Sequence, residues 1–136
     1  MVDLEVQCFL SRARDFLKGM ELLKDDLSEY RSSSALLGIH AAISYGDALR
    51  VGMGNRKVSS DDHQSAALDL KSMLAERRYG KKEGADRLGK LTSQKSKIAY
   101  SADSPTESAV KQIVDQAQRF AYWAEEAGRK LQIEGL

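Results

Sequence analysis

The chain has 136 residues, of which 42% are apolar and 30% are charged, with a formal net charge of +1. This length favours one domain over residues 1–136, and the composition is that of an ordinary globular protein. It excludes a disulfide framework, because Cys8 is the only cysteine, and a membrane-spanning helix, because no apolar run approaches about 20 residues. The acidic N-terminal sequence is unlike a signal peptide and predicts a cytoplasmic location. We expect Cys8 to be a buried small hydrophobic residue.

The first half of the chain predicts two helices. Apolar residues spaced by three and four positions indicate a helix over residues 3–29 and another over residues 32–53. The serines at 32–34 are candidate N-caps of the second helix. Residues 35–43 are apolar on almost every side, as expected of a helix surrounded by others. The second helix should therefore lie at the centre of a bundle.

The second half predicts three more helices, over residues 60–78, over residues 84–100 and from Pro105 onward. Ser60 is the expected N-cap of the first of them, and Lys95 interrupts the apolar stripe of the next. Ser104 should cap the last helix, with Pro105 in its first turn. No strand pattern is present in the sequence. The predicted fold class is therefore all-α, an up-and-down bundle of about five helices.

Several phrases of the sequence resemble the HEPN (higher eukaryotes and prokaryotes nucleotide-binding) superfamily. They are the stretch from Leu36 to Ile43 with Asp47-Ala48-Leu49, Ser60-Asp61-Asp62-His63, Lys97-Ile98-Ala99-Tyr100, Pro105-Thr106-Glu107-Ser108-Ala109, and Ala117-Gln118-Arg119-Phe120 in the last helix. The resemblance extends over most of the chain and implies a HEPN-like bundle.

The resemblance also implies a function. HEPN nucleases carry an Arg followed four to six residues later by a His on a late helix, whereas residues 95–101 here contain no His. Lys97 and Tyr100 look like the basic residue and the Tyr that non-nuclease relatives keep. The resemblance therefore implies a non-catalytic module that binds a nucleotide, RNA or a protein partner. Such a partner would be a small nucleotidyltransferase in a toxin–antitoxin or stress-response system.

Basic residues are concentrated in residues 76–97, a stretch that contains eight Lys and Arg residues and only three acidic residues. Such a stretch attracts phosphate, although a solvated helical face has the same composition. The candidates for phosphate binding are Arg56, Lys95, Lys97 and Tyr100.

The two histidines are candidates for a polar site. His40 and Asp47 are seven residues apart and share a helix face, and His63 is the third candidate. The alternative for His40 is a hydrogen-bonded core histidine, and for His63 a residue near the start of a helix. A metal-independent ribonuclease using a displaced pair, His40 or His63 with Arg56 or Lys97, is the alternative function.

No spacing of Cys, His and carboxylates indicates a metal site, and no motif indicates a cofactor. Tyr122 and Trp123 lie off the main apolar stripe of the last helix, and Trp123 either covers a dimer surface or completes the core. Because HEPN proteins often pair, the resemblance leads us to expect a homodimer. A structural helical protein without a small-molecule site is the remaining alternative.

Overall fold

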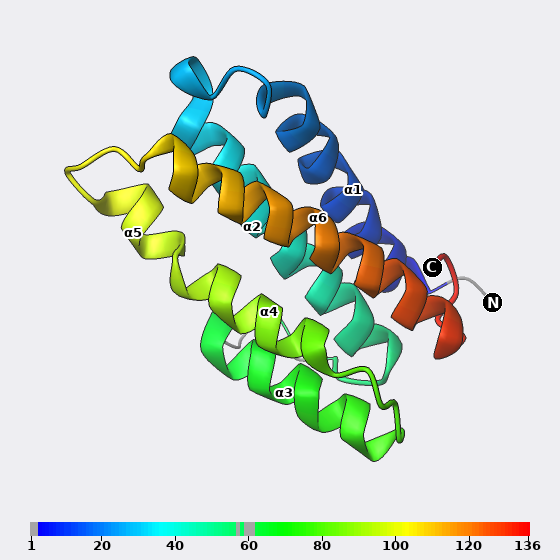
Figure 1. Ribbon diagram of the computed structural model, residues 1–136. Coiled ribbons are helices and arrows are strands. Elements are labelled where there is room, and N and C mark those ends of the chain that lie inside the picture. The colour runs from blue at the N-terminus through cyan, green and yellow to red at the C-terminus, as the bar shows by residue number, and fades with distance from the viewer. Residues whose placement is uncertain (1–2, 57, 59–61) are drawn as a thin grey trace.

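The computed structural model describes residues 3–56, 58 and 62–136, and within these residues it contains helices and no strands. The predicted all-α bundle is confirmed. The helices, labelled in Figure 1, are α1 (Leu4–Leu23), α2 (Leu27–Gly52), α3 (His63–Glu76), α4 (Glu83–Ser93), α5 (Lys95–Tyr100) and α6 (Glu107–Lys130).

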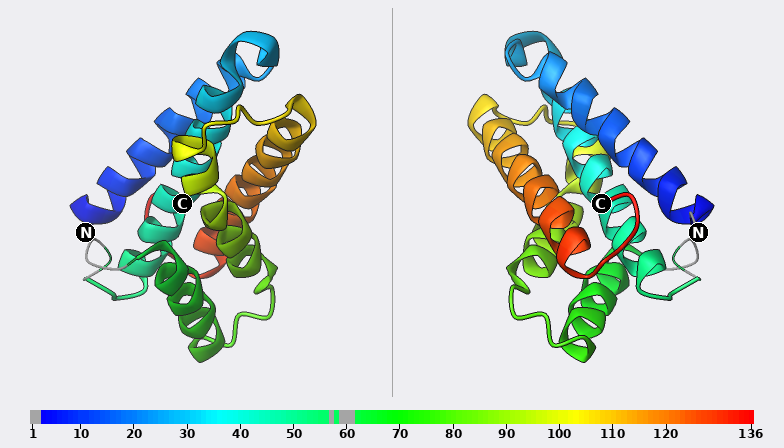
Figure 2. Two further views of the ribbon diagram at one scale, coloured as in Figure 1. Left: turned by 90° about the vertical axis from the view of Figure 1, so that its left-hand side faces the viewer. Right: turned by 90° about the vertical axis from the view of Figure 1, so that its right-hand side faces the viewer.

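The α2 helix is the centre of the bundle, as predicted, because it packs against each of the other five described helices. In Figures 1 and 2, α1 and α6 flank α2, while α3 and α4 lie side by side. Ala35, Ile39 and Ala42 of α2 are at most 1% exposed and belong to one buried cluster that receives side chains from all the described helices. Burial of this apolar surface is the main force that holds the bundle together.

The prediction of one helix over residues 3–29 was wrong. The α1 helix ends at Leu23, and Leu27 begins α2 after Asp26 takes the N-cap position. Tyr30 has non-helical dihedral angles (φ −123°, ψ 39°), so a kink separates the first turn of α2 from the regular helix. The serines at 32–34 consequently lie inside α2 and do not cap it.

The helix predicted over residues 84–100 is divided into α4 and α5 at Gln94. The Thr92 hydroxyl donates a hydrogen bond to the Gly89 carbonyl (3.1 Å), and the Ser93 hydroxyl donates to the Lys90 carbonyl (2.7 Å). These bonds compete with the helical backbone ladder and explain the break. Lys95 therefore becomes the first residue of a new helix.

Two helix starts differ from the prediction. The N-cap of α6 is Thr106, whose hydroxyl accepts a hydrogen bond from the Ala109 amide (3.1 Å), so Ser104 does not cap this helix. The N-cap of α3 is Asp62, which accepts from the Ser65 amide at 2.7 Å. Ser60, the predicted cap, lies outside the described residues.

Cys8 is exposed, so its predicted burial was wrong; α1 turns Val6 and Leu10 toward the core instead. Trp123 is 6% exposed and its indole N–H donates to the Lys81 carbonyl (2.8 Å). It completes the core and does not cover a dimer surface, whereas Tyr122 is 72% exposed. None of the described helices combines the length and apolarity needed to cross a bilayer.

Candidate functional site

The break between α4 and α5 brings Lys95 next to one of the predicted histidines. His63 is the first residue of α3, Lys95 is the first residue of α5, and Lys95 Nζ lies 3.3 Å from His63 Nε2. A lysine ammonium has only donors, so this contact requires a neutral imidazole whose Nε2 accepts. The proton of the neutral His63 ring is then on Nδ1.

His40 lies in the same region, on the face of α2 that carries Asp47. The His40 ring packs against Phe16 of α1 with ring centroids 5.5 Å apart. The charges of Lys95 and His63 both act on His40, and the charge of His63 acts on Asp47. Four of the predicted site residues are thus together, and the term histidine cluster denotes these four: His40, Asp47, His63 and Lys95.

Both histidines are neutral at pH 7. Burial, followed by the charges of Lys95 and His63, lowers the pKa of His40. Burial and then Lys95 lower the pKa of His63, against the opposing effect of Asp47 and Asp62. Each ring is half-buried, so part of it still faces solvent.

A buried ion network lies behind the histidine cluster. The Arg50 side chain is 1% exposed and contacts Asp47 Oδ1 and Asp69 Oδ2, each at 3.1 Å. Asn55 donates a further hydrogen bond to Asp69 Oδ2 (2.7 Å). Burial raises the pKa of Asp47, although the hydrogen bond and charge of Arg50 and the charges of His63 and Arg12 oppose this rise. Asp47 is therefore bound to Arg50, while Lys95 has no carboxylate within ion-pair distance among the residues that the structure describes.

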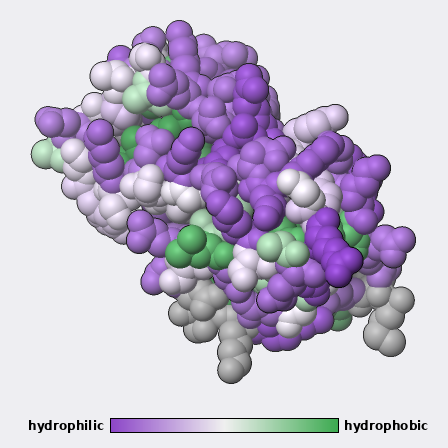
Figure 3. All heavy atoms as spheres, turned by 60° about the horizontal axis from the view of Figure 1, so that its bottom comes forward, coloured by the Kyte–Doolittle hydropathy of each residue, from purple (hydrophilic) through white to green (hydrophobic). Residues whose placement is uncertain are grey.

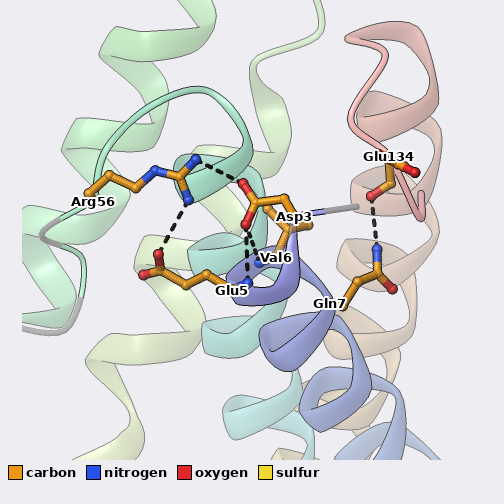
Figure 4. A network of polar contacts seen from close by, with 6 residues as sticks. All are labelled: Asp3, Glu5, Val6, Gln7, Arg56 and Glu134. Atoms are coloured by element: carbon orange, nitrogen blue, oxygen red, sulfur yellow. Dashed lines mark hydrogen bonds and ion pairs between the residues drawn. The ribbon is translucent and has the colours of Figure 1, made fainter. Parts of the chain in front are cut away.

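Arg56 lies outside the histidine cluster. Its guanidinium contacts Asp3 Oδ2 at 2.8 Å and Glu5 Oε2 at 3.3 Å at the start of α1 (Figure 4). These three residues are called the Arg56 network below. The hydrogen bond from Arg56 lowers the pKa of Asp3. No contact among the described side chains joins Arg56 to His63, so the structure does not form the displaced pair of His63 with Arg56.

Lys97 and Tyr100 also make no contact with the histidine cluster among the described residues. Both are exposed on α5, Tyr100 at 83%, and no described side-chain bond joins either residue to His63 or Lys95. Of the four residues predicted to bind phosphate, only Lys95 contacts a histidine.

A groove between α3 and α4, about 730 Å³ in volume, reaches Gln64 and Ser93, close in sequence to His63 and Lys95. Lys71, Lys90 and Leu68 line it, and Lys71 is paired with Asp86 (2.9 Å). The face shown in Figure 3 is mostly hydrophilic with small, separate hydrophobic patches. The groove lies next to the two helix starts, but neither His63 nor Lys95 lines it.

Sequence reasoning missed the buried network. Arg50 could have been noticed, because it is a charged residue near the end of an otherwise apolar central helix. No sequence pattern indicates its partner Asp69 on α3, because the pairing depends on how α3 packs on α2. Among the described residues, no group of three or more Cys, His and carboxylates could hold a metal ion.

No protein family, curated protein or solved structure with which the chain was compared matches it.

Proposed function

We propose that the chain is a non-catalytic, HEPN-like helical module that binds the phosphate groups of a nucleotide or RNA at the histidine cluster. The observation that carries this proposal is the contact between Lys95 Nζ and His63 Nε2, at 3.3 Å. The lysine is half-buried and has a neutral imidazole in place of a carboxylate among the described residues. An anion would supply the missing charge.

The chemistry of the cluster suits phosphate. A phosphate oxygen accepts hydrogen bonds from an ammonium group and from imidazole N–H groups, and bonds to charged groups are stronger than neutral ones. Lys95, His63 and His40 together offer such donors on a partly exposed surface. The excess of basic residues in 76–97 adds long-range attraction for a polyanion.

Binding of a fluorescein-labelled oligouridylate, followed by anisotropy at several salt concentrations, tests the proposal. We expect saturable binding that weakens as salt rises, because phosphate contacts release counterions. A second arm with uridine monophosphate separates a mononucleotide site from a site for a strand. Binding that ignores salt, or the absence of binding in both arms, would contradict the proposal.

RNA cleavage is the second candidate function, and the proximity of two histidines and a lysine favours it. One imidazole would take the proton of a 2′-hydroxyl, whose oxygen would attack the phosphorus atom. The 5′-oxygen would leave with a proton from the second imidazole, giving a 2′,3′-cyclic phosphate and a 5′-hydroxyl. Both rings are neutral at pH 7, however. A neutral imidazole can act as the general base, but the reaction also needs a protonated imidazole as the general acid. Binding therefore ranks above cleavage.

Incubation of the same RNA with the protein at pH 6 and pH 7.5, followed by gel analysis, decides between the two functions. If the protein cleaves the RNA and both His40→Gln and His63→Gln abolish the cleavage, the chain is a ribonuclease and not a non-catalytic binding module. RNA that remains intact, or cleavage unchanged in both variants, rules out catalysis by these histidines.

A further inference from the structure

We infer that the histidine cluster takes up a phosphodiester together with one proton, and that His63 is the residue that receives the proton. This inference rests on the proposed function and specifies how the site selects and releases its ligand.

The geometry of the contact requires this coupling. Lys95 Nζ is 3.3 Å from His63 Nε2, and the contact holds only while that nitrogen accepts a hydrogen bond. Protonation of His63 converts the acceptor into a donor and places two cations against each other. Among the described residues, Lys95 has no carboxylate that would offset this repulsion.

A bound anion removes the repulsion. A phosphodiester oxygen between the two groups accepts a hydrogen bond from Lys95 and another from protonated His63, so the anion and the proton stabilise each other. By linkage, the bound proton tightens binding of the anion by the same factor by which the bound anion tightens binding of the proton.

Among the described residues, the charged groups that act on His63 belong to α2, α5 and the start of α3. Lys95 of α5 favours the neutral ring of His63, while Asp47 of α2 and Asp62 at the start of α3 favour the protonated one. Both carboxylates already have other bonds, Asp47 with Arg50 and Asp62 with the Ser65 amide. Arg12 of α1 acts on Asp47 and further weakens its influence. Among the described residues, neither carboxylate forms a direct hydrogen bond or ion pair with the His63 ring, so an anion held between His63 and Lys95 would give the protonated ring a partner that it lacks.

The coupling favours a phosphodiester over a phosphate monoester. A monoester loses part of its own charge as the pH falls through about 6, which cancels the gain from a protonated histidine. A phosphodiester keeps its single charge over the same range. The affinity for an RNA strand should consequently increase more at mildly acidic pH than the affinity for uridine monophosphate.

The test is the dissociation constant of a hydroxyl-terminated oligouridylate between pH 5.5 and pH 8 at constant ionic strength. Neither uridine nor the phosphodiester titrates in this range, so the slope reports the protein. We expect the affinity to rise as the pH falls, by up to about tenfold per pH unit, the limit for one linked proton. His63→Gln, which keeps an acceptor for Lys95 but takes up no proton, should bind with a flat pH profile.

The comparison variant is His40→Gln, which removes one donor of the site and should weaken binding at every pH, but should keep most of the slope because His63 still takes up the proton. A flat profile in the unchanged protein overturns the inference but leaves the proposed function intact, and the absence of binding at every pH overturns both. A slope that persists in His63→Gln also overturns it. Calorimetry of the unchanged protein in buffers of different ionisation enthalpy at pH 6.5 is independent of the variants. Proton uptake approaching one per bound strand supports the inference, and no uptake contradicts it.

Discussion

The histidine cluster and the Arg56 network both join charged residues from distant segments, but they balance their charges differently. Arg56 contacts two carboxylates, Asp3 and Glu5, and its side chain is 56% exposed. Lys95 is half-buried and contacts an imidazole. The cation of the first arrangement is paired with carboxylates, whereas we propose that the second is completed by an anion from solution. A basic residue is therefore a better candidate for phosphate binding when the folded protein gives it no carboxylate partner than when its carboxylate partners are already in place.

The largest effect should follow from removing the buried network behind the cluster. Arg50→Met leaves Asp47 and Asp69 without their buried cation, and breaking such a pair costs about 3 kcal/mol. We expect the free energy of unfolding to fall by about this amount in urea titrations. Fluorescence of Trp123, the only tryptophan, follows the transition because its ring is 6% exposed in the folded chain.

The matched control for this prediction is Arg56→Met. Its ion pairs are exposed, and such pairs contribute little to stability. The free energy of unfolding should stay within experimental error. Equal losses in the two variants would mean that burial does not separate the two regions.

The next effect concerns affinity. Lys95→Met should weaken binding of oligouridylate about tenfold and reduce the slope of log K against log salt by about 1, as expected for the loss of one phosphate contact. Anisotropy titrations at three salt concentrations measure both quantities. Lys97→Met, on the same short helix but exposed, is the control and should change the affinity less. If Lys97→Met has the larger effect, phosphate binds elsewhere on α5.

The smallest effect is on the pH dependence of stability. The pKa values of His40 and His63 are lowered in the folded protein from an ordinary value of 6.5, so the unfolded chain binds more protons below about pH 6.5. The free energy of unfolding should therefore decrease as the pH falls from 7.5 to 5.5. Asp47, whose pKa is raised from 3.8, acts in the opposite direction in a more acidic range.

Urea titrations of the unchanged protein and of the double variant His40→Gln/His63→Gln measure this effect. The decrease should be smaller in the double variant, since glutamine does not titrate. A decrease of the same size in both proteins would assign the pH dependence to other groups.

The sequence predicted the fold where its pattern was strong and failed where tertiary contacts decide. The apolar stretch at residues 35–43 predicted the central helix correctly, because a helix without a polar face has to be surrounded. The break at Gln94 was missed, since it depends on the hydroxyls of Thr92 and Ser93 bonding to carbonyls within their own helix. The kink at Tyr30 was missed as well, and the structure gives no single contact that explains it.

The candidate site was predicted in part, for a similar reason. The spacing of His40 and Asp47 is a local property of one helix, and both residues lie in the regular part of α2, where seven positions make nearly two turns. The contact between His63 and Lys95 joins helix starts 32 residues apart and depends on the break that the sequence did not reveal. Arg56 was predicted to bind phosphate because it is basic, but its guanidinium contacts Asp3 and Glu5 at the start of α1 (Figure 4).

The most direct test of phosphate binding at the histidine cluster uses the side-chain signals of the histidines, because the chain has only two. A long-range proton–nitrogen correlation spectrum at pH 6.5 reports both rings, and hydroxyl-terminated oligouridylate is added stepwise. We expect the ring signals of His63 and His40 to shift saturably, with one dissociation constant that matches the anisotropy titration. If both rings stay unchanged while backbone amides elsewhere shift, the RNA binds at another surface and the account is wrong.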